Sequence, residues 1–452
     1  MDHSTIAPWA SPFAQKRLVA LEKLHAESSA SQVAASVGQA QSDYHVRVND
    51  GIMLYAGSNV LSPTVAALHD PALSTRPALG WPGEKVQTAV QEIEHLEVMT
   101  ARQVARSLNG KFAEVRFLTA TMANLAAYIA FTAPGDTIAV LSPEAGGHAS
   151  HQQILGTAGI RGLTVQHLPY SPRNFDIDVG AIHAFVHRVR PRLIVVGGSV
   201  TLFPHNLGPI REAADEVGAV LLYDASHTAG LIAAGHYQDP LDEGAHVVTF
   251  STYKTYGGPA GGAAVTDSAE FAERLSEAAY PILLSNYDPA RLGPLAVAAR
   301  EAIDQSPGWA TTTIDYAREL AVQLDSLGLV VVGRHLGYTQ SHQVVIDASL
   351  LGGGVAAVQR LERDGIYCGA CRLPWQRRDT LPDGVRLGTQ EFVRRGAGLD
   401  TVADLAKLIH RSLIATPGES LSADSIELRR RVTTDIWGRH VDVPVLEDGS
   451  SV

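Results

Sequence analysis

Residues 250–262 read Phe-Ser-Thr-Tyr-Lys-Thr-Tyr-Gly-Gly-Pro-Ala-Gly-Gly, which places Lys254 between an apolar, strand-like run and a glycine-rich turn. Asp224, 30 residues earlier, directly follows a second apolar run at 219–223. Pyridoxal 5'-phosphate needs both groups: an amine for its Schiff base and a carboxylate that keeps its pyridine nitrogen protonated. The ordered pair therefore predicts this cofactor, with Lys254 as its lysine and Asp224 as the partner of its ring nitrogen.

The composition limits the class of protein. A chain of 452 residues with 45% hydrophobic residues is too long for one ordinary core, so we expect a large domain and a smaller one. A net charge of −11 argues against nucleic acid or an anionic membrane surface as partner. No apolar run reaches the roughly 20 residues of a membrane span, and the N-terminus shows no secretory signal. We expect a cytoplasmic protein.

The middle of the chain alternates apolar runs with amphipathic stretches. The apolar runs are 137–141, 193–197, 219–223, 246–250 and 262–266, and 207–217 has the pattern of a helix. Near-continuous apolar strands between helices predict a parallel-type sheet that is buried on both faces. Ligands bind beyond the carboxyl ends of such strands, where Asp224, Ser199 and the Lys254 turn would all lie.

The domain organisation follows from the same patterns. We expect an N-terminal arm over 1–75, helical over 1–45, then a large cofactor-binding domain over 76–305, a small C-terminal domain over 306–416 and a partly disordered tail over 417–452. The arm would pack on a partner subunit. In the second half we expect helical segments at 289–325, 353–364 and 399–414, and strands at 329–332, 343–347 and 385–388.

Further residues have the chemistry of a cofactor site. Thr119, Ala120 and Thr121 open an amphipathic helix, whose N-terminus suits a phosphate, although a threonine there is also an ordinary helix cap. His148 follows two glycines and could stack on a pyridine ring, although a lone histidine is more often structural. His227 comes three residues after Asp224, which favours a contact with the same cofactor.

Arg386 lies in the run Val-Arg-Leu-Gly-Thr at 385–389, with apolar residues on both sides. A buried arginine can hold an α-carboxylate through two parallel hydrogen bonds, whereas the alternative is a surface ion pair. The apolar neighbours favour the first reading, so we expect a substrate of the α-amino-acid type.

Two cysteines, Cys368 and Cys371, form a single Cys-Gly-Ala-Cys motif. A structural zinc site needs four ligands and no second pair exists, so we expect no metal. Reduced thiols beside a strand are favoured over a redox pair.

Together these segments resemble serine hydroxymethyltransferase, a fold-type I pyridoxal phosphate family, over roughly residues 50–415. The matching segments are Asp224-Ala-Ser-His227-Thr-Ala-Gly-Leu, Ser251-Thr-Tyr-Lys254-Thr, Gly146-Gly-His148, Arg386-Leu-Gly-Thr389 and the turn Thr119-Ala-Thr121. The resemblance implies an α/β fold: an aspartate aminotransferase-like large domain with a mixed, mostly parallel seven-stranded sheet, plus a small α+β C-terminal domain.

The resemblance also implies roles for single residues. The catalytic residues would be Lys254, His148 and Tyr253. The substrate would contact Arg386 and Ser58. The cofactor would contact Lys254, Asp224, His227, His148, Thr119, Ala120, Thr121, Ser199 and Thr252. The family assembles as a homodimer or higher, in which a Gly-Gly turn of the neighbouring chain completes the phosphate site. Here that turn is altered to Ser285-Asn-Tyr287.

Several departures bear on the reaction. Ser58 stands where the family has the glutamate that serves folate chemistry, and Tyr253 replaces the histidine before the lysine. The other departures are Pro77, Leu79, Val86, Gln87 and Gly257. The resemblance therefore implies a folate-independent relative.

Four readings of the function remain open. The first is retro-aldol or transaldol chemistry on a β-hydroxy amino acid. The second and third are C–S β-elimination, and decarboxylation coupled to oxidative deamination, of an S-cysteinyl conjugate, as in relatives from lincosamide-type natural-product pathways. The fourth is a non-catalytic binding protein, which the joint retention of Lys254, Asp224, His148 and Arg386 disfavours.

Overall fold

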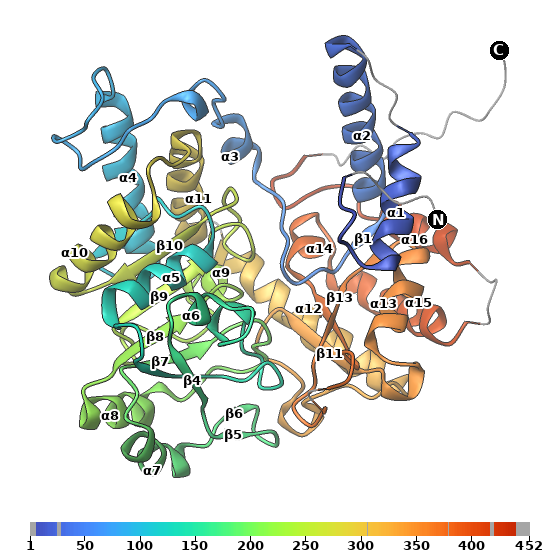
Figure 1. Cartoon of the computed structure of the whole chain (residues 1–452). Coiled ribbons are helices and arrows are strands. Elements are labelled where there is room, and N and C mark those ends of the chain that lie inside the picture. The colour runs from blue at the N-terminus through green and yellow to red at the C-terminus, as the bar shows by residue number, and fades with distance from the viewer. Residues whose placement is uncertain (1–5, 25–28, 305, 378, 416–419, 440–452) are drawn as a thin grey trace. The chain divides into compact units, whose positions relative to one another are not determined.

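The computed structural model describes residues 6–24, 29–304, 306–377, 379–415 and 420–439 (Figure 1). The chain divides into two units, one of residues 1–50 with 444–452 and one of residues 51–443. Of the tail predicted to be partly disordered, residues 417–419 and 440–452 lie outside the described residues.

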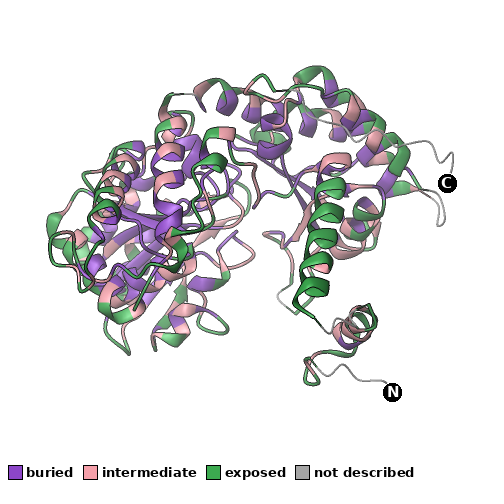
Figure 2. Ribbon diagram, turned by 90° about the horizontal axis from the view of Figure 1, so that it is seen from above, coloured by how far each residue is buried: buried purple, intermediate pink, exposed green. Residues whose placement is uncertain are grey.

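The N-terminal unit is helical, as predicted for this stretch. It contains α1 (Pro12–Glu22), capped by the hydroxyl of Ser11, and α2 (Ala30–Asp50). Most of α2 is exposed (Figure 2), including the apolar side chains of Val33, Val37 and Tyr44.

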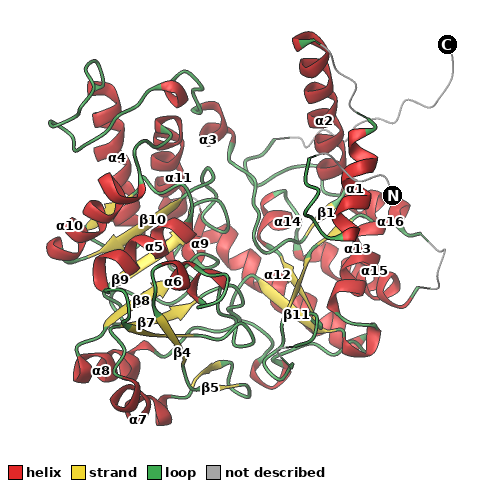
Figure 3. Cartoon of the chain, in the orientation of Figure 1, coloured by secondary structure: helices red, strands yellow, loops and turns green. Residues whose placement is uncertain are grey.

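A seven-stranded sheet organises the first part of the second unit (Figure 3). Its strands, in spatial order, are β2 (Phe112–Glu114), β10 (Gly262–Thr266), β9 (Val247–Ser251), β8 (Val220–Asp224), β7 (Leu193–Gly197), β3 (Thr137–Val140) and β4 (Thr164–His167). Only β10 runs antiparallel to its neighbours. The predicted mixed, mostly parallel seven-stranded sheet is therefore confirmed.

Both faces of this sheet are covered. In β7, Ile194 and Val196 belong to one apolar cluster, whereas Leu193 and Val195 belong to another. Side chains of a strand alternate between its two faces, and burying each such side chain contributes about 1.5–3 kcal/mol. The covering helices are α4 (Gln91–Ser107), α5 (Ala120–Phe131), α7 (Val179–Val189), α8 (Leu207–Val217), α9 (Ala229–Ala233), α10 (Ala269–Glu277) and α11 (Leu292–Asp304).

Shorter elements connect these layers. They are α3 (Pro63–Ala67), α6 (Thr157–Ile160), the hairpin of β5 (Tyr170–Ser171) and β6 (Asp176–Ile177), and the short helical turns η1 (Leu73–Thr75), η2 (Ala149–His151), η3 (Ala278–Leu283) and η4 (Pro289–Arg291).

A second apolar core follows the large sheet in the chain. Its antiparallel sheet has the order β11 (Gln343–Asp347), β14 (Gly384–Gly388), β13 (Gly369–Cys371). Its helices and turns are α12 (Ser306–Ser326), η5 (Arg334–Leu336), η6 (Ser349–Leu351), α13 (Gly354–Arg363), α14 (Gln390–Arg394), η7 (Leu399–Thr401), α15 (Val402–Ile414) and α16 (Ser422–Arg430). The sheet and helices form the α+β arrangement that the sequence predicted.

Early residues contribute to this second core. β1 (Ile52–Met53) pairs in parallel with β12 (Ile366–Tyr367), and Ile52 and Leu54 are fully buried there. The segment after β1 is thereby anchored beside the C-terminal elements, although the predicted domain boundaries at 75, 305 and 416 remain predictions.

One expectation needs correction. The predicted strand at 329–332 is wrong, because Val331 makes only an isolated bridge to Ile346. The left-handed turn at Gly333 (φ 81°) then leads into η5 and ends the pairing. Within the tail, residues 420–439 contain α16 and the buried Arg429. No helix of the described residues is long and apolar enough to cross a membrane.

Candidate active site

Lys254 and His227 meet at the carboxyl edge of the large sheet. Lys254 follows β9, its side chain is buried, and its Nζ lies 3.1 Å from Nε2 of His227. Burial lowers the pKa of Lys254 to about 8, with Asp224 opposing the shift and Arg386 adding to it. The lysine amine therefore has a substantial neutral, nucleophilic fraction near neutral pH.

The hydrogen bonds of His227 fix its tautomer. Its Nδ1 lies 3.1 Å from the carbonyl oxygen of Ala56, which can only accept, so Nδ1 donates. Burial, with Lys254 and Arg386 nearby, holds the pKa of His227 well below its usual value. In the neutral ring Nε2 is then the acceptor that faces the amine of Lys254.

Asp224 is the last residue of β8 and is fully buried. Its Oδ2 accepts hydrogen bonds from Nε2 of His151 at 2.8 Å and from Nδ2 of Asn124 at 3.1 Å, while Oδ1 accepts from the backbone N–H of Ser226 at 3.0 Å. Burial alone would raise the pKa of Asp224, but the hydrogen bond and charge of His151 outweigh it and hold the pKa well below its usual range. A fixed carboxylate of this kind fits a protonated pyridine nitrogen.

The residues that support Asp224 were not predicted from the sequence. Asn124 lies on α5 and His151 on η2, and Nδ1 of His151 is hydrogen-bonded to the hydroxyl of Tyr128. His342 was also missed; its ring stacks on that of His227 with centroids 6.0 Å apart and planes 10° apart. Burial lowers the pKa of His342 to about 3. No sequence spacing links these residues to Asp224 or Lys254.

His148 lies next to this cluster. Its Nδ1 accepts a hydrogen bond from the backbone N–H of Ser150 at 3.1 Å, and burial lowers its pKa. Its ring lies edge-on to that of His151, with centroids 6.2 Å apart. His148 is thus brought to the same site as Asp224, while its stacking on a pyridine ring stays a prediction.

The predicted phosphate end is built on α5. The hydroxyl of Thr119 accepts a hydrogen bond from Met122 N–H at 3.1 Å, so it serves as a helix cap, and Ala120 and Thr121 form the first helical turn. The first backbone N–H groups of a helix lack intrahelical partners and suit an anion. The Thr252 hydroxyl donates instead to the Pro259 carbonyl. The phosphate contacts of these residues remain predictions.

Arg386 and Ser199 face each other across the site. Arg386 lies on β14, and its Nη1 donates to the backbone carbonyl of Ser199, which follows β7. The backbone N–H of Ser199 donates to Gly146 at 2.7 Å, next to the His148 turn. Within the described chain the buried Nε of Arg386 has no hydrogen-bond partner. It is a donor that a carboxylate could satisfy.

Ser58 and Tyr253 differ in their surroundings. The hydroxyl of Ser58 donates to Oε2 of Glu391 at 2.6 Å. Tyr253 is 37% exposed, and burial raises its pKa. In the described part of the chain no hydrogen bond joins Tyr253 to Lys254, Asp224 or His148, so its catalytic role is still only a prediction.

Cys368 and Cys371 are free thiols. Burial raises the pKa of Cys371 to about 11 and that of Cys368 to about 12. Both are therefore protonated and poorly reactive at neutral pH, which fits the expected structural role. The described residues contain no group of three or more His, Cys, Asp or Glu side chains that could hold a metal ion.

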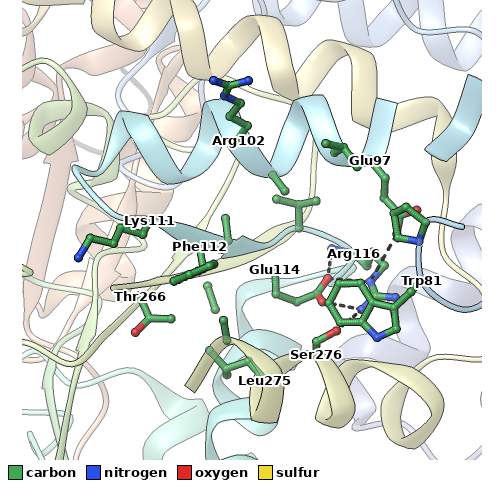
Figure 4. A pocket seen from close by; sticks show the side chains of 17 residues that line it. Trp81, Glu97, Arg102, Lys111, Phe112, Glu114, Arg116, Thr266, Leu275 and Ser276 are labelled. Carbon is green, nitrogen blue, oxygen red and sulfur yellow. Dashed lines mark hydrogen bonds and ion pairs between the residues drawn. The ribbon is translucent and has the colours of Figure 1, made fainter. Parts of the chain in front are cut away.

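A separate cavity of about 310 Å³ lies among α4, β2, β10 and α10 (Figure 4). Its polar lining includes Arg116, which forms an ion pair with Glu114 at 2.6 Å and lies under the ring of Trp81 at 5.4 Å from the ring centroid. None of the predicted site residues lines it. The candidate active site is therefore the Lys254–Asp224 cluster and not this cavity.

Comparison with known proteins identifies the family of this chain. The family model described as serine hydroxymethyltransferase matches residues 31–409. An alpha-methylserine aldolase of Variovorax paradoxus is 37% identical over 425 residues, covering 94% of this chain and 96% of the relative. A serine hydroxymethyltransferase of Korarchaeum cryptofilum (strain OPF8) is 38% identical over 403 residues, covering 86% of this chain and 93% of the relative.

A solved structure supports the fold. The crystal structure of an L-threonine transaldolase from Pseudomonas fluorescens matches with a TM-score of 0.81 and 24% identity, covering 89% of this chain and 91% of that one. The fold-type I architecture, the buried lysine and aspartate and the matched family agree. The chain belongs to the serine hydroxymethyltransferase family and is a pyridoxal-phosphate-dependent enzyme.

Proposed function

We propose that this enzyme cleaves or forms the Cα–Cβ bond of a β-hydroxy α-amino acid without folate, as an aldolase or transaldolase. The observation that carries the proposal is the unpartnered Nε of buried Arg386 at the Lys254–His227 pair, with Ser58 at the position of the folate-serving glutamate. The relatives' names support this class, since one of them is an aldolase at 37% identity.

Each residue has a defined task in this proposal. Bound pyridoxal phosphate supplies the electron sink for the bond that breaks. Lys254 offers a largely desolvated amine, and neutral His227 accepts a hydrogen bond from it through Nε2. Asp224 provides a permanent negative charge whose direction is set by His151 and Asn124.

Arg386 selects the bond. Its free Nε donates to the substrate α-carboxylate, and this fixes the rotation of the substrate about Cα. A clamped carboxylate presents the Cα–Cβ bond for cleavage and keeps the Cα–carboxylate bond out of the reactive direction. Decarboxylation is disfavoured for the same reason.

The loss of folate chemistry rests on the altered residues. Gln87 uses its side-chain oxygen to accept a hydrogen bond from Leu79 N–H at 2.8 Å, so these two replaced positions stabilise their own loop. Ser58 is bound to Glu391. The names of the relatives give no support to C–S elimination or oxidative deamination.

An end-point assay tests the proposal. The cofactor-loaded protein is incubated with threonine, phenylserine, α-methylserine and an S-alkyl-cysteine, with and without tetrahydrofolate, and Lys254→Ala serves as control. We expect aldehyde from at least one hydroxy amino acid, in equal amount without folate. Thiol or keto acid as the main product, or a strict need for folate, would overturn the proposal.

We also propose that the active form is at least a dimer, in which a second copy contributes to the phosphate site. The apolar side chains of Val33, Val37 and Tyr44, 50–60% exposed on α2, support a partner surface on the N-terminal arm. The turn at 285–287 retains polar side chains that could reach an anion on a neighbouring chain.

A further inference from the structure

The short helix α14 holds the segment 55–60 through the side chains of Gln390 and Arg394. Nε2 of Gln390 donates to the carbonyl oxygens of Tyr55 at 2.8 Å and Ser58 at 2.7 Å. Nη1 of Arg394 donates to the carbonyl oxygen of Val60 at 3.1 Å. Segment 55–60 is therefore fixed at both ends by one helix turn of the second core.

The same segment contacts the cofactor lysine on its other side. Ala56 accepts the Nδ1 hydrogen bond of His227, and Nδ2 of Asn59 donates to the backbone carbonyl of Lys254 at 2.9 Å. Ser58, which is only partly buried, thus lies between the Lys254 turn and α14.

Glu391 is the carboxylate of this arrangement and is 3% exposed. Its Oε2 accepts from the Ser58 hydroxyl at 2.6 Å, and its Oε1 accepts from Nε of Arg395 at 3.0 Å. A hydrogen bond of this length from a hydroxyl to a carboxylate is of the strong, charge-assisted kind. The Ser58 oxygen also lies 3.3 Å from the carbonyl oxygen of Tyr55, but the shorter contact assigns its single hydrogen to Glu391. The lone pairs of the Ser58 oxygen are then available to accept a hydrogen bond.

Glu391 therefore places a carboxylate next to Ser58, the position at which the family's glutamate is replaced. The family's glutamate is replaced by Ser58, but Ser58 is bound directly to a buried carboxylate from an element 333 positions further along the chain. A serine oxygen paired with a general base is the usual arrangement for moving a proton through a hydroxyl group.

We propose that Ser58 and Glu391 form a proton relay for the β-hydroxyl of the substrate, an inference that rests on the proposed function. In cleavage, the β-hydroxyl gives its proton to Ser58 Oγ while Ser58 gives its own proton to Glu391 Oε2. The β-carbon–oxygen bond becomes a carbonyl, the Cα–Cβ bond breaks, and its electron pair stays with Cα. Bond formation runs the same transfers in reverse.

The other bases nearby are less suited to this task. The Nε2 of His227 faces the Lys254 amine, so it is occupied. The Nδ1 of His148 accepts a hydrogen bond from the backbone N–H of Ser150. In the neutral ring its Nε2 then carries the hydrogen, so His148 has no free nitrogen that could accept a proton. Ser58 acts as the catalytic residue of the relay, and Glu391 is a positioning and proton-accepting residue behind it.

The test compares two reactions of the same cofactor-loaded protein. One is cleavage of phenylserine, followed as benzaldehyde. The other is exchange of the glycine α-proton in D2O, followed by ¹H NMR; it uses Lys254, Asp224 and Arg386 but has no hydroxyl proton to move. The variants are Glu391→Gln, Ser58→Ala and the double variant, and the melting temperature and cofactor absorbance of each are recorded.

For Glu391→Gln we expect cleavage to fall about 100-fold or more, the usual range for loss of a general base, while exchange changes by less than about 3-fold. The glutamine keeps one acceptor oxygen, for Ser58 or for Arg395 but not for both, and cannot take a proton. Ser58→Ala should give a similar pattern. The double variant should cleave phenylserine no more slowly than the slower of the two single variants, because both residues act in one pathway.

Gln390→Ala is the matched control, since it loosens segment 55–60 without touching the carboxylate; it should lower both reactions together. If the rates of cleavage and of exchange fall in parallel in Glu391→Gln, the relay is overturned. It is also overturned if the cleavage rate of this variant is unchanged. A wild type that exchanges glycine but cleaves no hydroxy amino acid overturns the proposed function, and the relay with it.

Discussion

Asp224 and Asn124 lie 100 residues apart in the sequence, and Oδ2 of the aspartate is 3.1 Å from Nδ2 of the asparagine. With His151 at 2.8 Å on the same oxygen, the carboxylate has its direction and charge set by the protein itself. Such preorganised charges need no rearrangement when the reaction develops charge nearby.

Asp224→Asn should therefore lower activity by on the order of 100-fold or more, because the amide cannot supply the counter-charge. Asn124→Ala removes one of the three hydrogen bonds that the Asp224 carboxylate accepts within the described residues but keeps its charge, so its effect on the rate should be smaller. Steady-state cleavage rates of both variants test this. Equal rates for Asp224→Asn and wild type would exclude the pairing.

Lys254→Ala should bind the cofactor without the absorbance band that borohydride bleaches, while its circular dichroism stays native. The reason is that the Lys254 amine is the only lysine nitrogen found beside Asp224 and His227 among the described residues. Lys407→Ala, whose side chain is 64% exposed on α15, serves as the spectral control. A reducible band that survives in Lys254→Ala would contradict the assignment.

The buried Lys254 should also make the free energy of unfolding of the cofactor-free protein depend on pH. The pKa of Lys254 is lowered from 10.5 to about 8 on folding, so between these values the unfolded chain binds more protons and stability rises with pH. Below pH 8 the buried charge destabilises the fold by about 3 kcal/mol.

Lys254→Met removes this charge and keeps an apolar chain. Urea unfolding should show the variant to be more stable than wild type at pH 7, with the difference shrinking as pH rises from 8 towards 10.5. A difference that is constant over this range would show that the amine is not desolvated.

Arg386→Lys should impair turnover by about 10-fold or more, because the charge is kept but the forked geometry is lost. The check compares an amino acid substrate with its carboxamide or decarboxylated amine. Wild type should strongly prefer the acid, and the variant should lose most of that preference. If wild type handles the amine equally well, Arg386 has another role.

The dimer proposal predicts that light scattering at micromolar concentration gives at least twice the 48.1 kDa chain mass. Val33→Asp with Val37→Asp places charge on the exposed apolar stripe of α2 and should weaken association. Ser42→Asp, on the opposite face of α2, is the matched control. An active, cofactor-bound monomer would rule the dimer out.

Local sequence predicted much of the large sheet and its two central groups. The apolar runs at 193–197 and 262–266 became β7 and β10 with the same bounds, because strands buried on both faces need nearly every residue to be apolar. Asp224 directly follows the run 219–223, and Lys254 comes four residues after the end of the run 246–250. The place of each at the sheet edge is therefore set by the strand that ends at it or shortly before it.

The same reasoning failed where pairing depends on distant residues. The run 329–332 has strand-like composition, yet only Val331 bridges to Ile346, since the chain turns at Gly333 before a ladder can form. Composition measures how well a segment suits a strand; it does not show whether a partner strand lies beside it.

The sequence by itself therefore determined the fold class, the cofactor and the family, because each of these depends on short segments that can be recognised one by one along the chain. Only the tertiary structure decided what surrounds each group: Asn124 and His151 at Asp224, His342 at His227, and Glu391 at Ser58. These contacts join residues up to 333 positions apart, and a hydrogen bond reaches only about 3 Å. Which side chains come within that reach is fixed by the packing of the strands and helices that carry them.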